Sequence, residues 1–250
     1  MEKDKKIAVL IDADNVSEKY IKYIIDEISN HGIPTYKRIY GDWTKPNLAS
    51  WKNVLLNYSI TPIQQYSYTT GKNSTDAALI IDAMDILYSN SVDGFCIVSS
   101  DSDFTKLAAR LREAGMLVIG MGEKKTPTPF ISACEMFKYL EVLVSMASKP
   151  VETKSVKETQ PPEEQKVGMT SINKLVATIK TIITEISDED GWAFLGKVGS
   201  TLNKRYPDFD TRNYGYAKLT PLVSSLNKFE IRSVRTSNPS ISLKYIRNKE

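Results

Sequence analysis

Short apolar runs alternate with helical periodicity along the first 145 residues of this 250-residue chain. The first run covers residues 7–11, and apolar residues then recur at every fourth position from Val16 to Ile28. This pattern predicts a buried strand followed by an amphipathic helix. Because the alternation repeats several times, we expect a parallel sheet covered by helices on both faces. The predicted strands cover residues 7–11, 33–40, 60–66, 95–98 and 116–121, and the predicted helices cover 16–28, 48–56, 75–88 and 104–111.

The composition changes at residues 148–168, where Lys, Glu, Thr, Gln and Pro replace the hydrophobic repeat. This composition is typical of a flexible linker. Beyond it, apolar residues at helical spacing predict three helices, which begin near residues 172, 195 and 219. Two alternating segments follow, with residues 236–239 as the turn of a hairpin. We therefore predict an α/β domain over residues 1–147, a linker over 148–168 and a small winged-helix (α+β) domain over 169–250.

The net charge of +3 is distributed unevenly along the chain. Residues 1–145 contain 16 basic and 18 acidic groups, whereas residues 146–250 contain 17 and 12, so the two parts carry −2 and +5. This difference suggests separate roles for the two parts. The two cysteines, Cys96 and Cys134, form no metal-binding motif, and no apolar run approaches the length of a membrane span. We therefore expect a cytoplasmic protein without a membrane partner.

Acidic residues follow two of the predicted strands. Asp12 follows the first strand, Asp101 and Asp103 follow the fourth, and Asp76 lies in the first turn of the helix predicted at 75–88. The carboxyl ends of parallel strands meet at one edge of the sheet, where open α/β proteins bind ligands. We therefore expect these four carboxylates to share a pocket. Two carboxylates about 4 Å apart repel by about 4 kcal/mol near a protein surface, so the cluster requires cations or protons.

The single histidine, His31, argues against histidine-based hydrolysis and histidine-rich zinc sites. Carboxylate oxygens are hard ligands that suit Mg²⁺ or Mn²⁺. One or two such ions would lower the pKa of bound water and neutralise charge on a phosphodiester. The sequence therefore predicts phosphoester hydrolysis, with these residues both catalytic and metal-binding: Asp12, Asp76, Asp101 and Asp103.

Several neighbouring polar residues have both a functional and a structural interpretation. Asn15 could assist the site, but Asn15 and Glu18 also have the spacing of a capping box. Asp76, Asp101 and Asp103 stand near helix N-termini, where their charges could equally be present only for a favourable interaction with the helix dipole. Further residues predicted to support the site are Asp82, which lies six positions beyond Asp76, and Ser99, Ser100 and Thr105, whose hydroxyls could orient water or complete the turn.

Three motifs together resemble the NYN family of PIN-like nucleases over roughly residues 6–143. They are Ile11-Asp12-Ala-Asp14-Asn15, Gly71-Lys-Asn-Ser-Thr-Asp76 and Ser99-Ser-Asp101-Ser-Asp103-Phe104. The resemblance implies a PIN-like (Rossmannoid) fold and RNA as the substrate. It also implies that Asp12, Asp76, Asp101 and Asp103 bind metal, with Asn15 as their companion. The chain departs from the family where Lys72 is followed by Asn-Ser-Thr, since relatives often have Lys-Gly there.

Residues from about 170 to 247 resemble the LOTUS (OST-HTH) domain, a winged-helix module that accompanies NYN domains. Asp190-Gly191-Trp192, Tyr206-Pro207 and Tyr214-Gly215 carry the likeness. The resemblance implies an RNA partner or a protein partner. Independently of it, this part interleaves cations with Tyr206, Tyr214, Tyr216 and Tyr245, a composition that suits phosphates and bases but also solvated surfaces and core packing. The residues predicted to contact RNA are Lys72, Lys124, Lys125, Lys204, Arg205, Arg212, Lys218, Arg232 and Arg235.

Three functions are compatible with these patterns. The first is a metal-dependent ribonuclease whose winged helix presents RNA to the acidic site, and the second is an RNA-binding adaptor that does not cleave. The third is a haloacid-dehalogenase-like phosphatase in which Asp12 attacks phosphate and Asp14 acts as acid and base. The turn after the fourth strand lacks the glycine usual in such phosphatases, and the first helix leaves no room for a flap. The sequence favours the ribonuclease and gives no oligomeric state.

Overall fold

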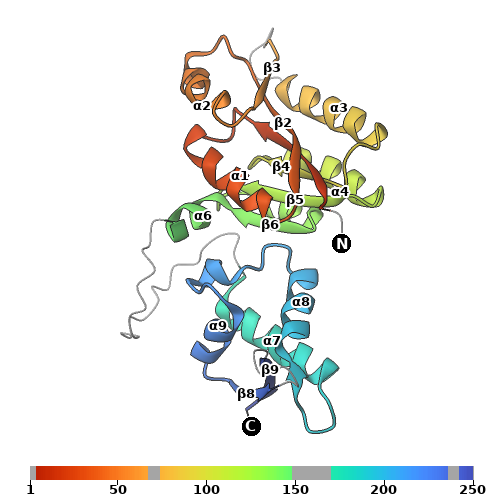
Figure 1. Cartoon of the computed structure of the whole chain (residues 1–250), viewed down its shortest axis with the longest axis vertical. Coiled ribbons are helices and arrows are strands. Elements are labelled where there is room, and N and C mark those ends of the chain that lie inside the picture. The colour runs from red at the N-terminus through yellow and green to blue at the C-terminus, as the bar shows by residue number, and fades with distance from the viewer. Residues whose placement is uncertain (1–3, 67–73, 148–169, 236–241, 250) are drawn as a thin grey trace. The chain divides into compact units, whose positions relative to one another are not determined.

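A computed structural model of the chain describes residues 4–66, 74–147, 170–235 and 242–249. The chain divides into two compact units, Met1–Gly168 and Met169–Glu250, each with its own hydrophobic core (Figure 1). Across the ranges that the structure describes, no helix combines the length and apolar character that crossing a bilayer requires. The linker predicted at 148–168 lies outside these ranges.

A six-stranded parallel sheet with the order β3-β2-β1-β4-β5-β6 forms the first unit. It confirms the predicted PIN-like α/β architecture. The strands are β1(Lys6–Asp12), β2(Ile33–Gly41), β3(Thr61–Gln64), β4(Gly94–Val98), β5(Leu117–Gly122) and β6(Met136–Tyr139). The helices are η1(Glu18–Tyr20), α1(Ile21–Ser29), η2(Pro46–Trp51), α2(Lys52–Leu55), α3(Ser74–Tyr88), η3(Ser102–Phe104), α4(Thr105–Glu113), α5(Thr128–Ala133) and α6(Leu140–Ala147).

The central strands β1 and β4 are buried on both faces, which explains their nearly uninterrupted apolar sequences. Alternate residues of these strands, such as Val9 and Cys96, pack with α1 and α6 in one core layer. The intervening residues face the opposite layer, where α4 contacts α5, and α3 contacts β1 and η3. The side chains of Asp12 and Ser99 continue this second row, so both point toward the α3 side of the sheet.

The first unit contains one strand and two α-helices that the sequence pattern did not predict, namely β6, α5 and α6. No element was predicted after the strand at 116–121, but α5 begins at Thr128 and β6 then pairs with β5. Strand β6 has only four residues and includes Lys138, so it shows no apolar run. Lys138 is nevertheless mostly buried, and its Nζ lies 3.8 Å from the carboxylate of Glu27 on α1.

Of the two interpretations of Asn15, the capping box with Glu18 is wrong. The first helical segment starts as the 3₁₀ helix η1, whose N-cap is Ser17, and no side chain caps it. Asn15 instead donates a hydrogen bond from Nδ2 to Oδ2 of Asp12 at 2.8 Å. A local contact with the last residue of β1 therefore engages the side chain that the capping-box spacing assigned to the helix.

The second unit has the helices and the small antiparallel sheet of a winged-helix-like domain, as predicted. The sheet order is β7-β9-β8, and the core includes Leu175, Val198, Leu222 and Ile246. The two-residue strand β7 was not predicted, and the predicted turn at 236–239 lies outside the described residues. The elements are α7(Ile172–Ile186), β7(Ala193–Phe194), α8(Leu195–Arg205), η4(Thr211–Tyr214), α9(Leu219–Ser225), β8(Phe229–Arg235) and β9(Ser242–Asn248).

Candidate active site

The candidate site lies where β1 and β4 meet at the centre of the sheet. Ile11 pairs with Val98, so the next residues, Asp12 and Ser99, lie side by side at the carboxyl ends of the two strands. The chain order runs from β1 to β3 on one side of this point and from β4 to β6 on the other. Open α/β sheets bind their ligands at such a reversal, because the loops after the two central strands separate there.

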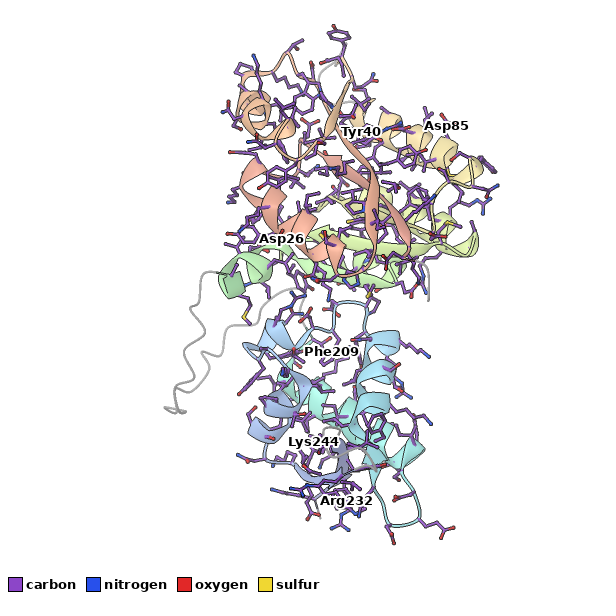
Figure 2. The ribbon with its side chains drawn as sticks, in the orientation of Figure 1. Asp26, Tyr40, Asp85, Phe209, Arg232 and Lys244 are labelled. Atoms are coloured by element: carbon purple, nitrogen blue, oxygen red, sulfur yellow. The ribbon has the colours of Figure 1, made fainter. Side chains whose placement is uncertain are left out.

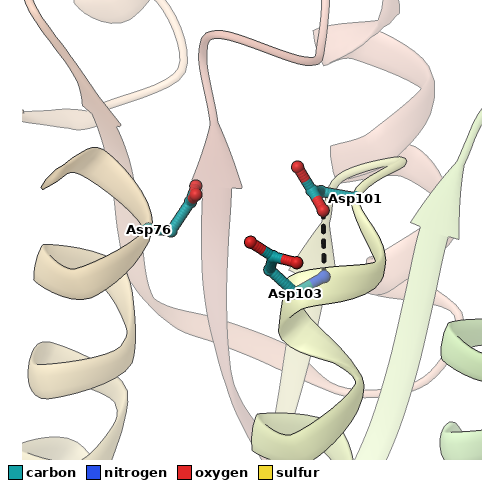
Figure 3. A group of neighbouring side chains, drawn as sticks. All are labelled: Asp76, Asp101 and Asp103. Atoms are coloured by element: carbon teal, nitrogen blue, oxygen red, sulfur yellow. Dashed lines mark hydrogen bonds between the residues drawn. The ribbon is translucent and has the colours of Figure 1, made fainter. Parts of the chain in front are cut away.

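Three of the four predicted acids converge in front of these strands. Asp76 comes from the first turn of α3, and Asp101 and Asp103 come from the turn after β4 (Figure 3). One carboxylate oxygen from each residue can be chosen so that the three oxygens lie within 4.8 Å of one another. Two oxygens on one cation of the Mg²⁺ or Mn²⁺ type lie at most about 4.2 Å apart, since the metal–oxygen distance is about 2.1 Å, so small side-chain movements would let these three ligate one ion.

The electrostatics of Asp76 show that the site favours positive charge. Burial raises the pKa of Asp76 to about 6, and the nearby charges of Asp12, Asp101 and Asp103 add to the increase. Part of the Asp76 population is therefore protonated near pH 6 when no cation is present. A divalent ion at these oxygens would replace that proton, so the residues present fit the hard cation that the sequence suggested.

Asp12 is completely buried and is not one of these three carboxylates. Its Oδ1 accepts a hydrogen bond from the backbone N–H of Asp14 at 3.0 Å, and its Oδ2 accepts from Asn15 at 2.8 Å and Ser99 at 2.7 Å. Burial raises the pKa of Asp12, and these three hydrogen bonds oppose the increase. Asp12 is thus a fixed carboxylate whose charge acts on Asp76.

Ser99 connects Asp12 to the acids of the turn after β4. Its hydroxyl donates to Asp12, and its oxygen accepts a hydrogen bond from the backbone N–H of Asp101 at 3.0 Å. Asp101 in turn accepts from the N–H of Asp103 at 2.9 Å and so caps η3 (Figure 3). The structural interpretation of Asp101 is therefore confirmed, because one of its oxygens caps η3, and its place beside Asp76 and Asp103 leaves the functional one as a prediction.

The family models agree with this geometry. A model of the NYN domain matches residues 6–141, more than half of the chain. The chain belongs to the NYN family. A second model, the OST-HTH/LOTUS domain, matches residues 170–241. NYN domains are part of the PIN-like nuclease superfamily, and OST-HTH/LOTUS domains are RNA-binding modules.

Solved structures of three bacterial proteins are also similar to parts of this NYN protein, whereas no curated protein matches it. A Vibrio parahaemolyticus protein of unknown function is 19% identical, with a TM-score of 0.46, over 56% of this chain and 94% of its own. An uncharacterized Nitrosomonas europaea protein is 29% identical, with a TM-score of 0.29, over 40% and 93%. A Chromobacterium violaceum segment is 32% identical, with a TM-score of 0.25, over 30% and 78%.

Other residues predicted to support the NYN site hold the surrounding turns. Ser100 accepts a hydrogen bond from the N–H of Glu123 at 2.9 Å, which ties the turn after β4 to the loop after β5. Thr105 donates to the carbonyl of Ser102 within its own turn.

Three lysines of the first unit were predicted to contact RNA. Lys125 forms an ion pair with Glu123 at 2.9 Å, and Lys124 is half-buried, with its backbone N–H directed to Glu141. Lys72 lies outside the described residues.

Asp82 anchors α3 on the NYN sheet. Its carboxylate accepts a short hydrogen bond from Arg38 and another from Tyr40, both on β2 (Figure 2 labels Tyr40). Burial, together with this contact, raises the pKa of Tyr40 above its usual range. The sequence analysis missed Arg38 and Tyr40. The sequence did contain a signal, because Arg38 and Tyr40 are two residues apart and so lie on the same face of their strand. Tyr40 pairs with Asp12, so this is the face that α3 covers.

Replacing Asp82 by asparagine should destabilise the NYN domain by about 1–3 kcal/mol, because the charge of Arg38 loses its partner in a half-buried position. Urea denaturation would measure this change. Asp85→Asn is the matched control, since Asp85 is exposed on the same helix (Figure 2), and it should change stability by less than about 0.5 kcal/mol. Equal unfolding midpoints for the two variants would contradict the anchoring role.

Three of the cations predicted to bind RNA in the OST-HTH/LOTUS domain form ion pairs. Arg205 pairs with Glu185, Arg212 makes a bidentate contact with Asp210, with Nη2 2.7 Å from Oδ2, and Nη2 of Arg232 lies 4.0 Å from Oδ2 of Asp188.

Two of the interleaved tyrosines also serve the fold, because the Tyr214 hydroxyl donates to the carbonyl of Thr170 and the Tyr206 hydroxyl contacts Thr178. The remaining predicted cations, all exposed, are Lys204, Lys218 and Arg235.

Proposed function

We propose that the chain is a metal-dependent ribonuclease that hydrolyses RNA phosphodiesters at the NYN site. The observation that carries this proposal is the convergence of Asp76, Asp101 and Asp103 within 4.8 Å beside buried Asp12. A phosphodiester is anionic, so a purely acidic pocket would repel it unless a cation were held between the two. The donor set supports Mg²⁺ or Mn²⁺ as that cation.

The proposed roles follow from the position of each carboxylate. Asp76, Asp101 and Asp103 would hold the cation, which when bound supplies Lewis-acid charge and lowers the pKa of water. Asp12 adds fixed negative charge beneath them; Asn15 and Ser99 hold its Oδ2 in place, and the backbone N–H of Asp14 holds its Oδ1. The hydrogen bond from the N–H of Asp101 to the Ser99 hydroxyl keeps the turn after β4 in register with β1. Attack of water on phosphorus would break the P–O3′ bond and release one product with a 5′ phosphate and one with a 3′ hydroxyl.

RNA is the proposed substrate because the acidic site is joined in one chain to a basic OST-HTH/LOTUS domain. Residues 146–250 carry a net charge of +5, whereas residues 1–145 carry −2. Basic surfaces attract the phosphate backbone largely independently of its sequence. The second domain would therefore supply most of the affinity for RNA, and the NYN site would supply the chemistry.

The geometry disfavours the phosphatase alternative. Its nucleophile would be Asp12, but Asp12 is completely buried and both of its oxygens accept hydrogen bonds. Asp14, the acid and base in that scheme, is exposed and lies 4.0 Å from Nζ of Lys45. The adaptor alternative differs from our proposal only in the absence of cleavage, so an activity measurement separates the two.

Purified full-length chain is expected to cleave labelled single-stranded RNA in the presence of Mn²⁺ or Mg²⁺. Removing the metal with a chelator should reduce the rate at least about tenfold, because the acidic pocket then repels phosphate, and added Mn²⁺ should restore it. Ligation of the products to a hydroxyl-ended acceptor would test for the 5′ phosphate. Cleavage that persists at full rate in chelator would rule out metal dependence, and its absence with every divalent ion would favour the adaptor.

A further inference from the structure

The small sheet of the second unit has one face in the core and one face in solvent. Ala193 of β7 pairs with Ile246 of β9, which pairs with Ile231 of β8, and this row packs into the core. Side chains alternate along strands, so the adjacent row lies on the opposite face. That row consists of Phe194, Tyr245 and Arg232, and 42% of the surface of Phe194 is exposed.

Planar groups form a continuous series across this outer face. The guanidinium of Arg232 lies 4.3 Å from the ring centroid of Trp192, and that of Arg247 lies 4.9 Å from the same ring. Arg232 is also 5.5 Å from the ring of Tyr245, which in turn lies 5.9 Å from the ring of Phe194. We call these five side chains the stacked face. Cation–π contacts of this kind fix side chains that would otherwise rotate freely.

The local backbone holds the stacked face in position. Asp188 accepts a hydrogen bond from the N–H of Trp192 at 2.6 Å, which closes the turn before β7. Gly191 in this turn has φ +78°, and a Cβ there would lie 3.4 Å from the side chain of Arg247. Glu230 accepts from Nε of Arg247 at 3.1 Å on the facing strand. The face is therefore formed before any ligand binds, which reduces the entropic cost of binding.

The positive charge of the second unit is concentrated on the two strands that bear this face. Residues 228–249 contain six Lys and Arg residues and one acid, a net charge of +5. The rest of residues 169–250 contains seven basic and seven acidic groups, so it is neutral overall. Figure 2 labels Arg232 on β8 and Lys244 on β9. The exposed cations Lys228 and Lys249 flank the two strands, and alternation places them in the same row as Arg232 and Arg247.

We propose that the stacked face binds single-stranded RNA, with bases stacking on Phe194 and Tyr245 and phosphates contacting the exposed cations around them. An exposed aromatic ring offers a surface to any unpaired base, whereas the base faces of a duplex are already stacked. The concentrated charge matches a phosphate backbone better than it matches a protein surface of mixed charge. This inference rests on the proposed function, because it identifies where the substrate of the nuclease is held.

Binding of a short labelled RNA to the full-length chain would test the inference, measured by fluorescence anisotropy in an Asp101→Asn background that prevents cleavage. Phe194→Leu removes the aromatic face but keeps apolar volume, and it should weaken binding about 5- to 100-fold. Phe194→Tyr keeps the ring and should bind within about twofold of the parent. Ile172→Ala, which alters an exposed apolar residue of the same unit, is the matched control. Thermal unfolding would verify that each variant is folded.

The contribution of the cations to RNA binding is measured separately, from the salt dependence of the affinity. Lys228→Ala should lower the slope of log affinity against log salt by about one, whereas Lys174→Ala on α7 should leave it unchanged. Unchanged RNA affinity in Phe194→Leu, or equal affinity for a duplex, would overturn the stacked-face proposal even if the chain cleaves RNA. Reduced affinity in Phe194→Leu together with no cleavage by the wild type would support the stacked face and reject the nuclease.

Discussion

Asp101→Asn is expected to lower the rate of RNA cleavage at least about 100-fold while leaving the fold intact. Asparagine keeps the side-chain oxygen that caps η3, since Asn and Asp are equally good at that position. What the substitution removes is one of three negative charges that lie within 4.8 Å of one another. The proposed site would therefore lose a ligand for its cation without losing its local structure.

The measurement for Asp101 is a single-turnover cleavage rate at saturating Mn²⁺, paired with an unfolding curve. Asp85→Asn is again the control, because it removes the same charge from the exposed side of α3. It should cleave at the wild-type rate to within about twofold, since surface substitutions away from the site have small effects. Wild-type cleavage by Asp101→Asn would show that this carboxylate does not participate, and the ribonuclease proposal would then fail.

The central sheet could be predicted because its strands are buried on both faces. Strands β1, β4 and β5 are almost entirely apolar, so their positions follow from the sequence to within about two residues. Strand β6 could not be predicted in the same way, because it is four residues long and contains Lys138. The charge of that lysine is accommodated by Glu27, more than 100 residues away in sequence. Sequence periodicity carries no information about such a partner.

The sequence could predict which acids lie at the candidate site, but not which of them are buried and which reach the surface. Parallel strands end at a common edge, so acids that follow β1 and β4 had to lie close together. Which of them are exposed depends on contacts that sequence does not give. Asp12 is buried with its Oδ1 bonded to the N–H of Asp14 and its Oδ2 to Asn15 and Ser99, whereas Asp76 is placed by a helix that Asp82 anchors to β2.

The cations of the second unit show the same limitation. The positions of Arg205 and Arg212 on the helical part suggested phosphate contacts, but both are paired with carboxylates. Arg232 was also predicted to bind RNA, and the structure places it between Trp192 and Tyr245, as part of the stacked face. That arrangement depends on the register of β8 and β9 and on the turn before β7. The strand register, and not the composition, therefore defines the stacked face.

Asp76→Asn is expected to abolish metal-dependent cleavage and yet to stabilise the metal-free protein. The pKa of Asp76 is raised from 3.8 to about 6 by burial and by the charges of its neighbours. The folded chain therefore binds this proton more tightly than the unfolded chain does. It follows that the contribution of Asp76 to the free energy of unfolding is most favourable below about pH 4 and is lost as pH rises through about 6.

The stabilisation by Asp76→Asn should consequently depend on pH and on metal. At pH 7.5 without metal, the variant should be more stable than the wild type by about 1–2 kcal/mol after allowance for solvent screening, and the difference should vanish near pH 4. Added Mn²⁺ should make the wild type the more stable of the two, because only the wild type retains all three carboxylates.

The affinity of the wild type for Mn²⁺, measured by calorimetry, should fall about tenfold per pH unit below pH 6, since the ion competes with the proton. A variant that is neither more stable without metal nor weaker in binding Mn²⁺ would show that Asp76 does not experience the charges of its neighbours, and the carboxylates would then not act as one site.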